Sequence, residues 1–178
     1  WCIVMIHLFK NKESPVITHF RVDPRDFMHS SVLLPLKTIN ALNEAARLLQ
    51  ERSKGQYEII LVRGYIHWNL LRKMRGILAK ILFRTLYCNN KSTAKLLFSA
   101  NGHDDGLSVD ILPYDVRLQK TIKFLSWKNV MMRESEAEQL LKVNSELINV
   151  MDKSMISAGF IRHSDPREKL QMHYRLCR

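Results

Sequence analysis

An amphipathic helix followed directly by an apolar strand is the sequence feature that most constrains this fold. Between residues 37 and 53, apolar residues recur at helical spacing, and Lys54 and Gly55 end the pattern. Residues 57–62 then form an almost continuous run of β-prone residues, which is typical of an inner strand. A helix with one apolar face needs a flat apolar partner, so we expect this helix to pack on a sheet.

The rest of the chain repeats this mixture of helices and short strands. Two more amphipathic helices are expected at residues 68–86 and 134–157. The expected strands lie at residues 1–9, 107–112, 121–127, 160–161 and 171–177. The last two strands are the arms of a terminal hairpin. This order predicts an α+β fold in which a small antiparallel sheet packs against about three helices.

The length of 178 residues and the hydrophobic content of 46% are enough for one compact core. We expect a single domain over residues 1–178, with residues 1–35 as an N-terminal extension packed on it. The apolar run at the N-terminus is shorter than the roughly 20 residues that cross a bilayer, so no transmembrane span is predicted. The oligomeric state is left open.

Cysteine usage limits how the chain can bind a metal. The three cysteines, Cys2, Cys88 and Cys177, are odd in number and far apart. They offer neither a disulfide framework nor the Cys-x-x-Cys spacing of a thiolate site. Any transition metal must therefore be held by histidine and carboxylate side chains.

The net charge of +11 is concentrated in the second expected helix. The basic residues of this helix are Arg72, Lys73, Arg75, Lys80 and Arg84, with no acid among them. Such a field favours nucleic acid, an anionic membrane surface or an acidic cell-wall polymer. The simpler interpretation is a solvated outer helix face. Because the chain has no recognised nucleic-acid-binding motif, we do not expect nucleic acid as its partner.

A histidine and an aspartate seven residues apart predict a metal site. Gly106 lets the chain turn after His103, and the strand that follows presents Asp110. Imidazole nitrogen and carboxylate oxygen both suit zinc, at roughly 2.0–2.2 Å. A catalytic zinc site needs three protein ligands and an open position, and His173 on the last strand is the expected third ligand. The alternative interpretations are that His103 is an ordinary loop histidine, that Asp110 faces solvent at a strand end, and that His173 is a hydrogen-bonded histidine of the core.

These residues resemble the zinc D,D-dipeptidases and D,D-carboxypeptidases of bacterial cell-wall metabolism, the family that contains the D-alanyl-D-alanine dipeptidases of vancomycin resistance. The first family signature, SxHxxGxAxD, corresponds to Asn101, His103, Gly106, Ser108 and Asp110. Asn101 replaces the serine and Ser108 replaces the alanine. The second signature, Glu-x-x-His followed by an aromatic and an apolar residue, is matched in part by residues 173–176. The resemblance covers residues 36–178.

The resemblance implies a zinc-dependent peptidase that hydrolyses D-Ala-D-Ala or related short peptidoglycan peptides through a metal-activated water. Its partner would be a D-amino-acid dipeptide or a peptidoglycan stem peptide. The location is left open between the bacterial periplasm and the cytoplasm, with the periplasm slightly favoured. The chain begins with Trp1 rather than Met, which leaves open that a targeting segment has been removed.

Two positions depart from the family pattern. The general base, three residues before the last histidine, would fall at Leu170. The hairpin loop is longer than usual, so Glu168 or Asp165 could reach the metal, and Glu168 is our candidate base. The family arginine, directly after Gly-Tyr, would fall at Ile66, and Arg63 is our candidate substitute. Arg63 lies three positions before Ile66, and on a regular strand two residues at this spacing face opposite sides of the sheet.

Two other functions stay open, the first because of these departures and the second because of the basic helix. The first is a catalytically impaired relative, a metal-stabilised domain that binds cell-wall peptides or a protein partner. The second is a basic module that binds nucleic acid or an anionic surface through the helix at residues 68–86.

Overall fold

The structure is a computed structural model that describes residues 5–10, 16–24, 31–65, 77, 81, 103–124, 134–162 and 169–177. Its strands are β1 (Met5–Phe9), β2 (Arg21–Val22), β3 (Ser31–Pro35), β4 (Tyr57–Arg63), β5 (Ser108–Asp115), β6 (Lys120–Thr121), β7 (Phe160–Arg162) and β8 (His173–Leu176). Its helices are α1 (Leu36–Arg52), α4 (Glu134–Val143), α5 (Ser145–Ser157) and the short 3-10 helix η1 (His103–Asp105). The predicted α+β class is confirmed.

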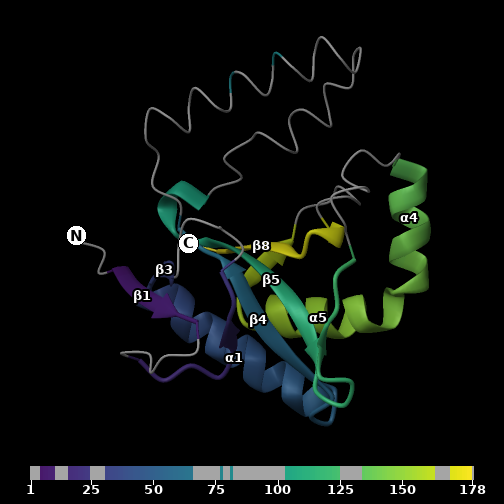
Figure 1. Cartoon of the computed structure of the whole chain (residues 1–178), viewed down its shortest axis with the longest axis horizontal. Helices are drawn as coiled ribbons and strands as arrows, with labels where there is room; N and C mark the ends of the chain where they lie inside the picture. The colour runs from purple at the N-terminus through teal and green to yellow at the C-terminus, as the bar shows by residue number, and fades with distance from the viewer. Residues whose placement is uncertain are drawn as a thin grey trace.

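The main sheet has the strand order β2-β4-β5-β8-β7, and β6 pairs with the C-terminal end of β5. Strands β4, β5 and β8 of this sheet are labelled in Figure 1. Its neighbours are antiparallel except β2 and β4, which are parallel. The expected terminal hairpin is present as β7 and β8. Strands β1 and β3 form a separate two-stranded antiparallel ribbon.

Helices α1 and α5 lie side by side and cover one face of the sheet (Figure 1). From β4, Ile59 and Leu61 belong to the core on this helix-covered face. Ile60 and Val62 belong to a smaller apolar cluster on the opposite face. Because successive strand residues point to opposite faces, a strand buried on both sides must be apolar throughout, which explains the unbroken apolar run.

The N-terminal segments share this core. Leu8 of β1 and Leu34 of β3 are fully buried, and Phe20 is also buried. All three belong to the apolar cluster that contains the α1 and α5 side chains. The described N-terminal residues therefore pack against the rest of the chain.

The prediction of one helix over residues 134–157 was wrong, because the segment divides into α4 and α5 at Asn144. The side-chain amide of Asn144 donates to the Leu140 carbonyl, with an Nδ2–O distance of 2.8 Å. Asparagine competes in this way for backbone partners and interrupts helices. Amphipathic spacing continued across the break and concealed it.

The strand expected at residues 121–127 was also misplaced. Only Lys120 and Thr121 form β6, residues 122–124 are not in a strand, and residues 125–127 lie outside the described chain. Pro113, expected to flank a strand, lies inside β5. Its carbonyl accepts from the backbone N–H of Ile122 at 2.8 Å. A strand residue directs its N–H and C=O to the same side, so the missing proline donor lies away from β4.

Two expected segments lie mostly outside the described residues. Of the basic helix at residues 68–86, only Ile77 and Ile81 are described, and both are helical and more than half exposed. The polar loop at residues 87–102 is not described. Among the described helices, none combines the length and apolar character needed to cross a membrane.

A partly buried charged network ties α5 to the hairpin of β7 and β8. The Arg162 guanidinium pairs with Asp152 of α5 and also donates to the Lys169 carbonyl. The Tyr174 hydroxyl donates to Asp152 at 2.7 Å. Burial raises the pKa of Tyr174 well above its usual value, so this hydroxyl stays protonated and remains a donor. The network supports β8 from the helix-covered side.

Replacing Asp152 with alanine should destabilise the fold strongly. Arg162, only 5% exposed along its side chain, would lose its carboxylate, as would the Tyr174 hydroxyl. Breaking a buried ion pair costs about 3–5 kcal/mol, and we expect about 3 because Asp152 is partly exposed. Urea unfolding monitored by circular dichroism measures this loss. Asp23→Ala, which breaks an exposed pair with Lys10, is the control, and an equal loss in both variants would contradict the prediction.

Candidate metal centre

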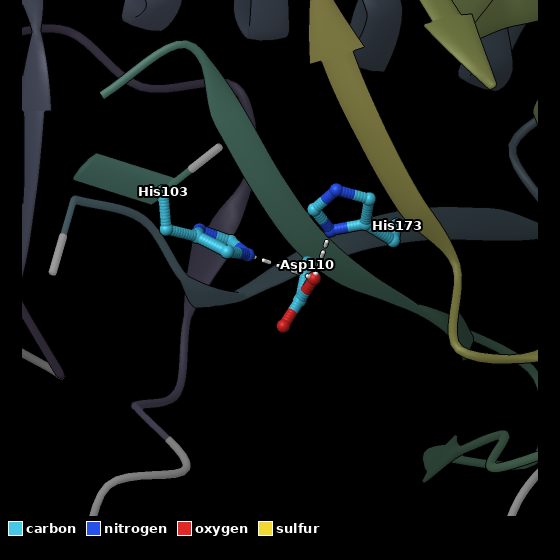
Figure 2. Close-up of side chains that lie close together, drawn as sticks. All are labelled: His103, Asp110 and His173. Atoms are coloured by element: carbon cyan, nitrogen blue, oxygen red, sulfur yellow. Dashed lines mark hydrogen bonds and ion pairs between the residues drawn. The ribbon is translucent and has the colours of Figure 1, made fainter. Parts of the chain in front are cut away.

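Three buried side chains from three separate elements meet on the sheet face opposite α1 and α5. His103 begins η1, Asp110 lies in β5, and His173 begins β8. The possible ligand atoms of these residues all lie within 4.8 Å of one another, so the group could hold a metal ion. Figure 2 shows the two imidazole rings approaching the Asp110 carboxylate from different sides. The structure thus brings together the three ligands predicted from the sequence.

One carboxylate oxygen of Asp110 lies close to both histidine rings. Asp110 Oδ1 lies 2.7 Å from His173 Nδ1 and 3.3 Å from His103 Nε2. The second distance is close to the separation, about 3.4 Å, of two ligand atoms on a tetrahedral metal ion with bonds of roughly 2.1 Å. The first distance is that of a hydrogen bond, whose proton stands where a metal ion would bind.

The tautomer of His103 also fits a metal ligand. His103 Nδ1 lies 2.7 Å from the carbonyl oxygen of Gly64, and a carbonyl can only accept. The proton is therefore on Nδ1, and in the uncharged ring Nε2 presents its lone pair to Asp110. Two lone pairs facing each other repel unless a cation lies between them. Donation from the second ring nitrogen to a carbonyl is typical of metal-binding histidine.

The Asp110 carboxylate is held in its charged form. Burial alone would raise the pKa of Asp110, but the close contacts with His103 and His173, and the positive charge of these rings when they are protonated, outweigh it. The pKa therefore lies well below its usual value. A metal ligand must be deprotonated, so this carboxylate is already in the form that binds a cation.

A β-bulge brings Arg63 to the same carboxylate. Leu61 lies opposite Ile111, but the next pair is Arg63 with Asp110, so Val62 is an extra residue in β4. On a regular strand Arg63 would share the helix-covered face of Leu61. The bulge reverses this, and Arg63 Nη1 lies 3.3 Å from Asp110 Oδ2. The side chain is about half exposed.

Glycines shape the backbone around His103. A Cβ on Gly64 would lie 2.6 Å from Leu34 Cδ2 and 2.7 Å from the Leu33 carbonyl oxygen, so only glycine lets β4 approach β3 this closely. This approach positions the Gly64 carbonyl for His103. Gly106 has a φ of 72°, and its carbonyl accepts from the buried Thr38 hydroxyl at 3.0 Å. Helix α1 is thereby tied to the turn between His103 and Asp110.

The residue before His173 adopts an unusual backbone conformation. Met172 has a φ of 54°, in the left-handed region, which costs roughly 1–2 kcal/mol in a non-glycine residue. Its carbonyl accepts from Ile111 N–H at 3.2 Å, and its N–H donates to Lys169 at 3.0 Å. The fully buried side chain adds packing. These contacts hold a turn that directs His173 toward Asp110.

The structure describes some of the positions predicted to be catalytic and not others. Leu170, at the position of the family base, packs in the core on the helix-covered face and is 1% exposed. Glu168, our candidate base, and its alternative Asp165 lie outside the described residues, as does Ile66. Among the predicted catalytic residues, Arg63 is described, and it lies at the site.

Sequence reasoning missed two contacts beside the candidate ligands, the Gly64 carbonyl on His103 and the ion pair of Asp105 with Arg175. The Gly64 carbonyl leaves no trace in a residue pattern, because every residue has a carbonyl. Asp105 and Arg175 each stand two positions after a predicted histidine ligand, and their side chains form an ion pair. The equal spacing and opposite charges were a signal that could have revealed this pair.

The chain matches no known family model, and no curated protein matches it. A metal centre is therefore supported by the geometry of His103, Asp110 and His173 alone.

Divalent transition-metal ions should stabilise the folded chain. At a free ion concentration 100 times Kd, binding adds about 2.7 kcal/mol, which raises the melting temperature by about 5–10 °C for a chain of this size. Differential scanning fluorimetry with Zn²⁺ and Co²⁺ tests this. His103→Ala and His173→Ala should remove the shift, whereas His19→Ala, at an exposed histidine, should keep it. An unchanged shift in the two site variants would exclude these ligands.

Proposed function

We propose that the chain is a zinc-dependent peptidase that hydrolyses D-Ala-D-Ala or related short peptidoglycan peptides. The observation that carries this proposal is that His103, Asp110 and His173 lie close together, with His103 Nδ1–H donating a hydrogen bond to the Gly64 carbonyl. Their spacing along the chain resembles the zinc D,D-peptidase signatures.

Zinc is the favoured ion because of the ligand set. Two imidazoles and one carboxylate are a donor combination used in catalytic zinc sites, and three protein ligands leave a position open. When bound, zinc supplies Lewis acidity, which lowers the pKa of a coordinated water toward 7 and polarises a carbonyl. Asp110 offers one oxygen to this site, because Oδ2 faces Arg63.

Arg63 is the candidate group for the substrate carbonyl. It contacts Asp110 Oδ2 through Nη1, yet about half of its side chain is exposed. A guanidinium has five N–H donors, so one contact leaves others for a substrate oxygen. Positive charge fixed beside a reacting carbonyl stabilises the developing oxyanion. The bulge in β4 thus supplies a cation of the kind that the family arginine provides.

The surroundings of the ligands favour strong electrostatic interactions. The apolar side chains Ile60, Val62 and Leu112 lie on the same sheet face as Asp110 and are all buried. Apolar, water-poor surroundings lower the local dielectric constant, which strengthens the attraction between an ion, a carboxylate and a polarised carbonyl.

A second candidate function rests on Leu170. A leucine side chain has no atom that accepts a proton, and Leu170 is buried in the core, so the position of the family base supplies no base. The chain would then be a catalytically impaired relative in which the metal stabilises a domain that binds cell-wall peptides or a protein. Zinc binding without turnover would select this function.

Release of D-alanine from D-Ala-D-Ala tests the peptidase directly. We expect zinc-loaded protein to be active and His103→Ala to be inactive. Arg63→Met should lower kcat/KM by about 100-fold, the typical effect of losing one oxyanion-stabilising donor. Arg21→Met, at a comparably exposed arginine of β2, should keep full activity. Equal activity of Arg63→Met and Arg21→Met would remove Arg63 from the chemistry.

Glu168→Gln tests the proposed general base. Glutamine is nearly the same size as glutamate but cannot accept the proton, so kcat should fall by about 100- to 10,000-fold. Zinc affinity, measured by competition with a chelating dye, should not change. Asp165→Asn is the comparison variant. Loss of turnover in Asp165→Asn, with Glu168→Gln fully active, would assign the base to Asp165.

A further inference from the structure

We propose that the ion pair between Asp105 and Arg175 is a clamp that sets the separation of the two histidine ligands. It rests on the metal site proposed above. Asp105 lies two residues after His103, and Arg175 lies two residues after His173. Both are positioning residues, since neither belongs to the ligand set.

The clamp joins two segments that are 70 positions apart in the sequence. The Arg175 guanidinium donates to Asp105 Oδ2, which connects β8 to the end of η1. Beside it, the backbone N–H of Leu176 donates to the Leu107 carbonyl at 2.8 Å. The side-chain pair therefore extends the β5–β8 pairing beyond Ser108, toward His103.

Asp105 uses both carboxylate oxygens. Oδ2 accepts from Arg175, and Oδ1 accepts from the backbone N–H of Leu107 at 3.0 Å. The second bond closes the turn that follows η1. One side chain thus fixes the turn after the first ligand and links it to the strand that carries the third ligand.

Such a pair contributes more to positioning than to stability. The side chains of Asp105 and Arg175 are 25% and 35% exposed, and partly exposed ion pairs add little to folding free energy. Metal affinity is more sensitive, because ligands must be held close to their bound geometry. Loss of a group that orients ligands typically lowers metal affinity 10- to 100-fold.

The arrangement of the ligands explains why a clamp is needed here. His103 lies in a short 3-10 helix, whereas Asp110 and His173 are directly opposite each other in paired strands. Strand pairing fixes the positions of Asp110 and His173. The position of His103 depends on the Gly64 carbonyl and on the turn that Asp105 closes.

A double-mutant cycle in the full chain tests the clamp, with Zn²⁺ affinity as the readout. Asp105→Asn keeps an oxygen for the Leu107 N–H but removes the charge, and Arg175→Met removes the guanidinium. Each variant should weaken zinc binding by about 10-fold, and the double variant should be no weaker than either single variant. Arg175→Lys should recover part of the affinity.

Two measurements separate the clamp from a general loss of structure. The melting temperature without metal should change no more than in Arg21→Met, which breaks an ion pair of similar exposure with Glu58. The visible absorption of the Co²⁺-loaded variants should keep its wild-type shape, because the ligands are unchanged.

The outcomes distinguish this inference from the proposed function. Wild-type zinc affinity in both single variants, or losses that add in the double variant, would overturn the clamp while leaving the metal site intact. A fall in melting temperature that accounts for the lost affinity would also overturn it. Absence of zinc binding by the wild-type chain would overturn both proposals.

Discussion

The pairing of β5 with β8 is the constraint on which the site depends. Its register places Asp110 opposite His173 on one face and Val109 opposite Tyr174 on the other. A slip of one residue would turn His173 toward the helices and Tyr174 out of the core. Burial of Tyr174 and Leu176 against α5 and β7 opposes that slip. The hydrophobic core thereby fixes where two of the three possible ligands lie.

Polar side chains buried beside this core need hydrogen-bond or ion-pair partners, and most of these side chains have one. His103 has the Gly64 carbonyl, and Asp110 receives both histidines and Arg63. Ser108 is the exception on this face, since its buried hydroxyl has no hydrogen-bond partner in the described part of the chain. Alanine occupies this position in the dipeptidase signature, and an unpaired buried hydroxyl costs free energy that alanine would not.

The sequence predicted elements and ligands better than it predicted orientation. Helix α1, strand β4 and the terminal hairpin followed from periodicity, because each buries a regular apolar pattern. The three candidate ligands followed from residue type and spacing. The bulge that turns Arg63 was hidden, because Val62 reads as an ordinary strand residue until its partner strand is placed. The break at Asn144 was hidden because apolar spacing continued through it.

The two departures from the dipeptidase pattern differ in how a fold can compensate for them. An arginine can be recovered by a bulge, since one extra residue reverses the direction of a side chain without disturbing the core. The missing base cannot be recovered in this way, because Leu170 occupies its position and fills space in the core, where a carboxylate would be costly to bury. In the proposed peptidase, the candidate metal ligands and the proton acceptor are therefore under separate constraints. Strand register holds Asp110 and His173, whereas a base must come from a segment that the core does not hold.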